Sequence, residues 1–534
     1  MRDEFFPRIR EDFEVVCRRA AEFGFNALSI DDLAHLHANP DYPADLQTRI
    51  EAYRTLYRSL FTTAAAHGLG VYVTTDIMYH HPAIEAACGQ RPDKLFDYLA
   101  RAVDELFNDF PEVRGIISRI GESDGLDVEG DFNSRLTIKY PHQARRCLRR
   151  LLPVFEKNNR RWIFRTWSVG AYRVGDLIWN RDTLQKIFEG ITSQHLILSM
   201  KHGESDFFRY LPVNKQFFRG HLPRIIELQA RREYEGAGEY PSFIGGEAER
   251  FRDALREHPA MCGAMVWCQT GGWLRFRRLT FIDPEGIWNE LNTWVAMRVL
   301  KEGQDADAAI VAWCRRYAPE MNYAKFIRLL ELSSDVVTRL LYVDEFARRK
   351  VFFRRLRIPP LLAVYWDHVM INHSMRQVLR CFVNDGEAVI QRGEEALRLI
   401  DEMHALAGDL GLPQRDIDFM RDTYRILAAA RIYYFREFDP AYARRLEAMR
   451  DAYRARHAVR YSIHLDFRPV KIKTRRLRLY LRILFREKRG YRILDRVFTI
   501  RILGWLYPAM KRLGLKFLPE FSHKQAMGVD TVFR

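Results

Sequence analysis

Charged side chains follow directly after two short strand-like runs in the middle of this sequence. The run LILSMK ends at Lys201 and is followed by Asp206, and the run RIIELQ is followed by Glu233. Carboxylates placed in this way can position and deprotonate a water molecule, while a further carboxyl group supplies a proton. The alternative is a pair of solvated loops that are polar for no catalytic reason.

Aromatic side chains stand near the same kind of run. Trp167, Trp267 and Trp273 lie within or just beyond strand-like runs, and five of the seven runs are followed by acids or a lysine. Sugars are bound by aromatic platforms and charged hydrogen-bonding groups, and glycoside hydrolysis uses paired carboxylates. Any single polar loop is better explained by solvation, but the concentration of carboxylates and tryptophans favours carbohydrate chemistry.

The elements that must position these residues alternate along the chain. Segments such as EDFEVVCRRAAEFG have apolar residues at helical spacing, and Gly24 and Gly68 stand where two such helices should end. Seven strand-like runs alternate with the helices, at residues 26–30, 70–75, 114–120, 161–167, 195–201, 224–229 and 263–268. Strands separated by helices predict a parallel sheet.

The count of strands favours a (β/α)8 barrel of the TIM type. No GxGxxG pattern follows any strand, which argues against a dinucleotide-binding sheet. A barrel needs eight strands, and the first predicted helix begins about ten residues from Met1. Either a strand is hidden in the sequence or the chain begins after the first strand. In both cases the chemistry is expected at the ends of the strands.

A more specific pattern links several of these runs. LILSMKHGESDFF, which contains Asp206, is followed by IIELQARREYEG, which contains Glu233. Upstream, GFNALSIDD, HGLGVYVTTDI and RWIFRTWSVG occur in that order. These segments resemble glycoside hydrolase family 67, the α-glucuronidases, over roughly residues 12–330. The resemblance implies inverting hydrolysis of a glycosidic bond to a uronic acid or a related sugar.

The resemblance also implies roles for individual carboxylates. Glu122 becomes the general acid, with Asp124 as an alternative, because the family's loop after this strand is replaced by GESDGLDVEG. Asp206 and Glu233 become the pair that positions and deprotonates the attacking water. Arg232 replaces the family's glutamine before Glu233, and a cation there is expected to lower the pKa of a neighbouring carboxyl group.

Cationic residues match the family's positions for holding the sugar acid. Arg165 and Lys201 match such positions closely and Arg119 approximately, and cations grip a carboxylate through charge-assisted hydrogen bonds. Asp31 and Asp32 stand where the family has paired asparagines. Two carboxylates at that place would repel a uronate.

Composition narrows the classes of partner. From Lys471 to Arg534 the chain holds 17 Lys and Arg against four acids, so 13 of the net charge of +16 lies in a tail, which argues against nucleic acid as a partner. Seven cysteines without CxxC pairs favour free thiols and a cytoplasmic protein. No apolar run is long enough to span a bilayer and no signal peptide is visible. The sequence shows no ligand spacing for a metal and no cofactor motif.

Three regions are predicted. Residues 1–310 form the barrel, residues 311–465 form an all-α C-terminal domain, and residues 466–534 form a basic amphipathic tail. The helical domain either only packs on the barrel or also builds a homodimer. In the tail, one helical stripe is basic and the opposite stripe is apolar; the arginines are 475, 478, 482, 486 and 489, and the apolar residues are 477, 480, 481 and 484. The tail either lies on its own domain or binds the inner face of an anionic membrane.

Two functions therefore stand side by side. The first is a glycoside hydrolase of the α-glucuronidase type acting on a carbohydrate substrate. The second is a non-catalytic carbohydrate-binding or polysaccharide-assembly protein on a degenerate glycosidase barrel, which the missing first strand and the altered loop around Glu122 favour.

Overall fold

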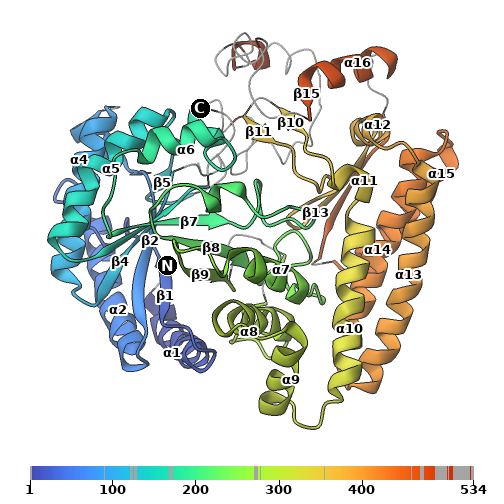
Figure 1. The fold of residues 1–534 in the computed structure, drawn as a ribbon, viewed down its shortest axis with the longest axis horizontal. Helices are drawn as coiled ribbons and strands as arrows, with labels where there is room; N and C mark the ends of the chain where they lie inside the picture. Colours follow the sequence, from blue (N-terminus) through green and yellow to red (C-terminus); the bar gives the residue numbers. More distant parts are fainter. Residues whose placement is uncertain are drawn as a thin grey trace.

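The structure of the chain is a computed structural model (Figure 1). It describes residues 3–89, 91–120, 124, 129–167, 172–269, 275–276, 278–353, 355–458, 460–468 and 474–487, and the separate positions 493, 502, 504–508 and 530. Glu122 and Trp273 lie outside the described residues, and so do parts of the basic tail.

A seven-stranded parallel sheet forms the N-terminal half, and its strands coincide with the seven predicted runs. In order along the chain and across the sheet they are β1 (Ala27–Asp31), β2 (Gly70–Asp76), β4 (Val113–Arg119), β6 (Arg161–Arg165), β7 (Leu196–Lys201), β8 (Arg224–Gln229) and β9 (Met261–Trp267). Each strand pairs in parallel with the next one. The predicted strands and their parallel pairing are confirmed.

Closure of the sheet into a barrel differs from the prediction. Among the described residues, β1 pairs with β2 alone and β9 pairs with β8 alone, so the sheet is a curled half-barrel with two edges. A barrel closes only when hydrogen bonds join its first and last strands, and within the described part of the chain no further strand lies between β9 and β1.

Helices cover the outer face of this sheet (Figure 1). Gly24 and Gly68 follow the first two helices with φ of +90° and +73°, as the sequence predicted, because glycine adopts this conformation without a steric penalty. The helices are α1 (Phe6–Glu22), α2 (Ala44–Ala66), α3 (Pro82–Cys88), α4 (Pro92–Asp109), α5 (Pro141–Lys157), α6 (Arg181–Phe188), α7 (Gly245–Leu255) and α8 (Ile287–Glu302). Short elements add η1 (Asp3–Phe5), β3 (Tyr79–His80), β5 (Asn133–Ser134) and η2 (Arg173–Asp176).

The connection from β7 to β8 contains only η3 (Lys215–Phe218), a single 3-10 turn. Arg224 holds this connection in place, since its guanidinium is fully buried and donates hydrogen bonds of 2.6–3.2 Å to the carbonyl oxygens of Gln216, Phe217, Arg219, Gly220 and Leu222. One buried cation thereby satisfies backbone acceptors that a helix would otherwise satisfy within itself.

The C-terminal region is mainly helical, with α9 (Ala306–Tyr317), α10 (Tyr323–Val336), π-helical η4 (Val337–Leu341), α11 (Asp344–Ala347), α12 (His373–Phe382), α13 (Gly386–Asp409), α14 (Gln414–Phe435), α15 (Pro440–Arg456) and α16 (Thr474–Leu484). Helices α10, α13 and α14 pack side by side (Figure 1). Within the described part of the chain, no helix is long and apolar enough to cross a bilayer.

Two small sheets correct the prediction of an all-α C-terminal region. One joins β10 (Phe352–Phe353), β11 (Leu356–Arg357) and β15 (Phe485–Arg486), and the other joins β12 (Val364–Tyr365), β13 (His368–Asn372) and β14 (Ser462–Asp466). The β10–β13 segment is rich in aromatic and β-branched residues, which favour extended pairing. The helical periodicity of the flanking segments masked this signal.

Candidate active site

The concave face of the curled sheet carries the charged residues at the carboxyl ends of several strands. Side chains alternate between the two faces of a strand. On one face of β4, β6, β7 and β8 a buried isoleucine cluster forms from Ile117, Ile163, Ile197 and Ile225, whereas the alternate positions pack against the outer helices. Because side chains on one face recur at every second residue, the residues two and four positions beyond these isoleucines belong to the same concave face. They lie nearer to the carboxyl ends of the strands.

Glu227 of β8 lies on this face, two positions beyond Ile225, and is fully buried. Its carboxylate accepts hydrogen bonds from the Arg165 guanidinium at 2.9–3.2 Å, from the Ser199 hydroxyl at 2.7 Å and from the Trp267 indole at 3.3 Å. Burial alone would raise the pKa of Glu227, but the charges of Arg165 and Lys201 hold it below its usual value. Glu227 was not among the predicted site residues, and its place two positions beyond Ile225 was the available signal.

Asp206 follows β7 and is almost completely buried. It forms an ion pair with Lys201 and accepts hydrogen bonds of 2.8 Å from the Tyr234 hydroxyl and 2.9 Å from the backbone N–H of Phe207. Burial opposes ionisation of the carboxyl group, but Lys201 and these hydrogen bonds lower its pKa below the usual value. Asp206 is therefore an anion at neutral pH.

Glu233 follows β8 and lies in the same neighbourhood as Asp206. Its backbone N–H donates to the side-chain oxygen of Gln229 at 2.9 Å, and its side chain is almost completely buried. Burial raises the pKa of the hydroxyl groups of Tyr234 and Tyr365, and the carboxylates of Asp206 and Glu233 raise both further. Asp206 and Glu233 therefore both lie near these two hydroxyl groups.

Tyr365 reaches this site from β12 in the C-terminal region, far along the chain from Glu233. No local pattern in the sequence linked it to the strand ends. Tyr234 was present in the polar stretch after β8, where its position directly after Glu233 was a usable signal.

Trp167 and Lys201 meet at the rim. The Lys201 ammonium lies 3.7 Å from the centroid of the Trp167 ring, at cation–π distance. The Trp167 side chain also packs against a cluster formed by Ile178, Trp179 and Phe352. The tryptophan is thus held by residues that follow β6 and by β10 of the C-terminal region.

The acidic residues at the ends of β1 and β2 interact with Arg119 or with His35. Asp76 pairs in bidentate fashion with Arg119 at 2.6 and 2.9 Å, and Asp32 bonds to the His35 ring at 2.7 Å. Asp31 lies on the concave face and is accessible to solvent. Partial removal from bulk water raises the pKa of its carboxyl group. The charge of Arg119 lowers this pKa, and the charge of Asp32 raises it further. Asp31 and Arg119 therefore influence each other, whereas Asp32 contacts His35.

The remaining loop residues after β4 are only partly described. Asp124 accepts a hydrogen bond from the Ser134 backbone N–H at 2.7 Å. Glu122 lies outside the described residues, so its predicted role as the acid stays a prediction.

The rest of the polar stretch after β8 contacts the C-terminal region. Glu235 accepts hydrogen bonds from Arg209 at 3.1 Å, Arg232 at 2.6 and 3.0 Å, Tyr342 at 2.8 Å and Ser242 at 2.5 Å. Burial alone would raise its pKa, but Arg209 and Arg232 lower it to about 2. Arg232 is therefore the ion-pair partner of Glu235, and this is the neighbouring carboxyl group whose pKa it lowers.

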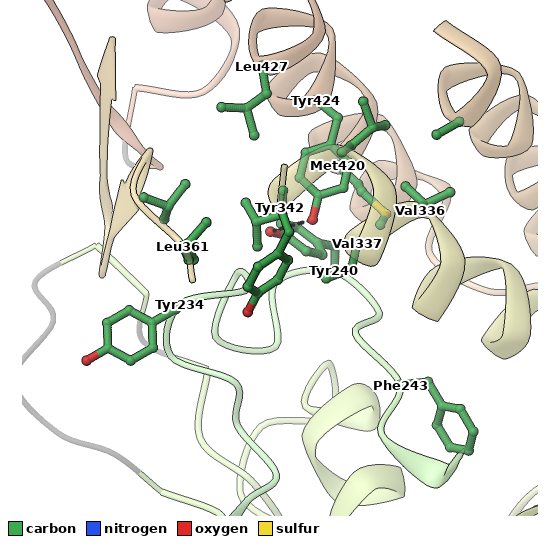
Figure 2. Close-up of a cluster of buried hydrophobic side chains, with 14 of the residues drawn as sticks. Tyr234, Tyr240, Phe243, Val336, Val337, Tyr342, Leu361, Met420, Tyr424 and Leu427 are labelled. Carbon is green, nitrogen blue, oxygen red and sulfur yellow. Dashed lines mark hydrogen bonds between the residues drawn. The ribbon is translucent and has the colours of Figure 1, made fainter. Parts of the chain in front are cut away.

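Glu239 makes a similar link. It lies 3.0 Å from Arg460 and 3.4 Å from Arg278, and Arg278 also forms a bidentate ion pair with Asp416 at 2.7 and 2.8 Å. Figure 2 shows Tyr240, Tyr342 and Tyr424 gathered in an apolar cluster, while Tyr234 lies apart with its hydroxyl directed away from it. The stretch after β8 thus divides into a part at the candidate site and a part that joins the two halves of the molecule.

A pocket of about 580 Å³ lies elsewhere, on the outer side of the sheet. It is lined by α6, the β7–β8 connection and Leu198. None of the predicted site residues lines it. Among the described residues, no group of three or more His, Cys, Asp or Glu could hold a metal ion.

Comparison with known proteins gives a likeness of fold. No protein-family model matches the chain, and no curated protein matches it. The solved structure of a family 138 glycoside hydrolase that targets the pectin rhamnogalacturonan II matches 85% of this chain, with a TM-score of 0.50 and 12% identity. This chain covers 58% of the length of that protein.

A second solved structure, that of CpGH84B, is similar over 84% of this chain and 68% of the CpGH84B chain, with a TM-score of 0.40 and 10% identity. The first likeness shows the fold alone, a curled parallel α/β sheet of the kind present in a glycoside hydrolase, and it does not single out family 67.

Proposed function

We propose that the protein is a glycoside hydrolase whose reaction takes place at the rim formed after β7 and β8. The observation that carries the proposal is the place of Asp206 and Glu233: both are almost completely buried just beyond two neighbouring strands, and both lie near the hydroxyl groups of Tyr234 and Tyr365. Both acids follow neighbouring strands of a parallel sheet, which is where enzymes on such sheets place their chemistry.

In this proposal the two carboxylates handle the attacking water. Asp206 is kept ionised by Lys201 and holds the water through a free lone pair, while Glu233 accepts its proton. Glu122 protonates the leaving oxygen on the other side of the sugar. An inverting enzyme separates the acid from the base by about 6.5–9.5 Å, which leaves room for the water.

The charges of the site argue against a uronate as the bound sugar. Each cation that was expected to hold a uronate already pairs with a carboxylate: Arg119 with Asp76, Arg165 with Glu227 and Lys201 with Asp206. A sugar acid would have to displace these partners in a site that also contains Asp31. A neutral sugar can hydrogen-bond to the same groups without that cost, so we propose a neutral sugar next to Asp206.

The non-catalytic alternative is supported by a different observation. The sheet has two edges where a closed barrel would have none, and a protein released from catalysis can lose a strand and still bind a glycan. Such a protein would keep the aromatic and hydrogen-bonding groups of the rim but would not depend on ionised carboxylates.

Hydrolysis of matched aryl glycosides separates these cases. We expect the full chain to cleave glycosides of neutral sugars faster than those of uronic acids, and Glu233→Gln to lose activity. Glu437→Gln, which changes a carboxylate that is 94% exposed, is the matched control and should keep full activity. Binding of oligosaccharides without cleavage of any glycoside would instead establish the non-catalytic function, and faster cleavage of uronides would refute the neutral-sugar proposal.

A further inference from the structure

The helix α16 is attached to the rest of the molecule on one side. Directly after it, β15 pairs with β10, and the Phe485 ring lies 6.0 Å from Phe353 and 6.2 Å from Phe382 of α12. Glu487 adds an ion pair with Arg349 at 2.7 Å. Figure 1 shows α16 at the edge of the molecule beside α12. Because α16 packs against α12, its opposite face points outward.

The outward face has an apolar centre between arginines. At about 100° per residue, the exposed side chains of α16 that the structure describes occupy about 120° of its circumference. Leu479 and Ile483 lie in the middle of this arc and are 57% and 42% exposed. Exposed arginines 475 and 482 flank them on one side and arginine 476 on the other. Leu481, which belongs to the apolar stripe predicted from the sequence, lies outside this arc and is half-buried. The exposed apolar residues Leu479 and Ile483 are not members of that predicted stripe.

We propose that this face of α16 docks on a bilayer that contains anionic lipid. Apolar side chains enter the boundary between headgroups and acyl chains, and arginines beside them extend to the lipid phosphates. The surrounding tail carries 13 of the 16 net positive charges of the chain, which attract a negative surface.

Charge and apolarity together distinguish the bilayer from other partners. An acidic polysaccharide would neutralise the arginines but offers no apolar layer for Leu479 and Ile483. A second copy of the chain docked through the same face would bring arginines against arginines, which costs free energy. A bilayer with anionic headgroups satisfies both kinds of side chain.

The docked helix would hold the rim of the candidate site near the bilayer. Helix α16 continues into β15, β15 pairs with β10, and Phe352 of β10 lies 4.9 Å from Trp179 in the cluster that also contacts Trp167. A glycan carried at a membrane surface would then lie beside the rim. The docking itself does not depend on the proposed hydrolase activity.

Co-sedimentation of the full chain with vesicles tests the docking. We expect binding to vesicles of phosphatidylcholine and phosphatidylglycerol, little binding to phosphatidylcholine alone, and weaker binding as salt is raised, because salt screens the attraction. The double variant Leu479→Asn/Ile483→Asn keeps every charge and should bind at least about tenfold more weakly, because it removes the two apolar side chains that would enter the bilayer. Tyr323→Asn, a change of an equally exposed side chain on α10, is the matched control and should bind like the wild type.

A second variant tests the charges independently. Arg475→Gln/Arg482→Gln should weaken binding by about fivefold for each arginine removed and reduce the dependence on salt. The proposal is overturned by equal binding to neutral and anionic vesicles, by unchanged binding of both double variants, or by binding that a soluble acidic polysaccharide abolishes without lipid specificity. Conversion of a dimer to a monomer by Leu479→Asn/Ile483→Asn, without vesicle binding by the wild type, would assign the face to a second copy of the chain.

Discussion

The hydroxyl group of Tyr234 donates a hydrogen bond of 2.8 Å to Oδ2 of Asp206. The two residues come from the connections that follow β8 and β7, which are neighbouring strands. The bond therefore ties two loops together at the rim of the curled sheet. It also stabilises the ionised form of Asp206, which makes the pKa of this group a measurable property of the candidate site.

Removal of this hydroxyl should shift the pH dependence of activity. Lys201 and Tyr234 outweigh burial and lower the folded-state pKa of Asp206, so Tyr234→Phe should raise that pKa. A lost hydrogen bond to a charged acceptor corresponds to about one pH unit. We expect the acidic limb of kcat/KM to move to higher pH by that amount. Tyr240→Phe, which removes a buried hydroxyl that bonds to Tyr424 and Tyr461, should leave the limb in place.

The same shift should appear in stability. A depressed carboxyl pKa contributes stability above the unfolded value of about 3.9, and this contribution is lost as pH falls through the folded value. In Tyr234→Phe the contribution should be smaller, and its loss should be complete at a higher pH than in the wild type, because the folded pKa lies closer to the unfolded one. Urea unfolding across the acidic range measures it, and identical profiles for the two proteins would contradict the assignment.

The Lys201–Asp206 pair should behave as a buried ion pair. Asp206→Asn leaves the Lys201 ammonium buried without its anion, which costs about 3–5 kcal/mol of unfolding free energy. The double variant Lys201→Met/Asp206→Asn should recover most of this stability and none of the proposed activity. Full activity in the stable double variant would show that Asp206 has no part in the reaction.

Glu235 should matter for stability and not for chemistry. Glu235→Gln leaves Arg209 and Arg232 without their shared anion, and we expect a loss of about 3–5 kcal/mol in urea unfolding. Because its pKa is lowered to about 2, the wild type should lose the Glu235 contribution as pH falls from about 4 towards 2. The exposed Glu437→Gln variant should unfold like the wild type. A stable but inactive Glu235→Gln would place this residue in the site instead.

Glu122 should act on the leaving group alone. Glu122→Ala should slow the cleavage of poor leaving groups far more than that of activated aryl glycosides, because only the former need a proton. Glu233→Ala should slow both by about 10²–10⁴-fold. NMR of the first-formed sugar should show inverted configuration, and a retained configuration would rule out the proposed division of roles.

Several features of this protein were determined by local sequence. The seven strands could be predicted because β-branched and aromatic runs and the helical spacing between them are properties of neighbouring residues. The positions of Arg119, Arg165 and Lys201 on one face of the sheet follow from the two-residue period of a strand. Parallel pairing of neighbouring strands then places Asp206 and Glu233 at one rim.

Other features were decided only by tertiary structure. The open edges depend on whether β1 and β9, which lie far apart in the sequence, can pair. Tyr365 joins the site because the C-terminal region packs against the rim, and Glu235 faces away from it because Arg209 and Arg232 surround it. The outward face of α16 is likewise set by what its other face contacts. A glutamate after β8 belongs to the candidate site or to an ion pair with the C-terminal region, depending on which part of the chain packs against it. Local sequence does not determine this, because the packing partners are distant along the chain.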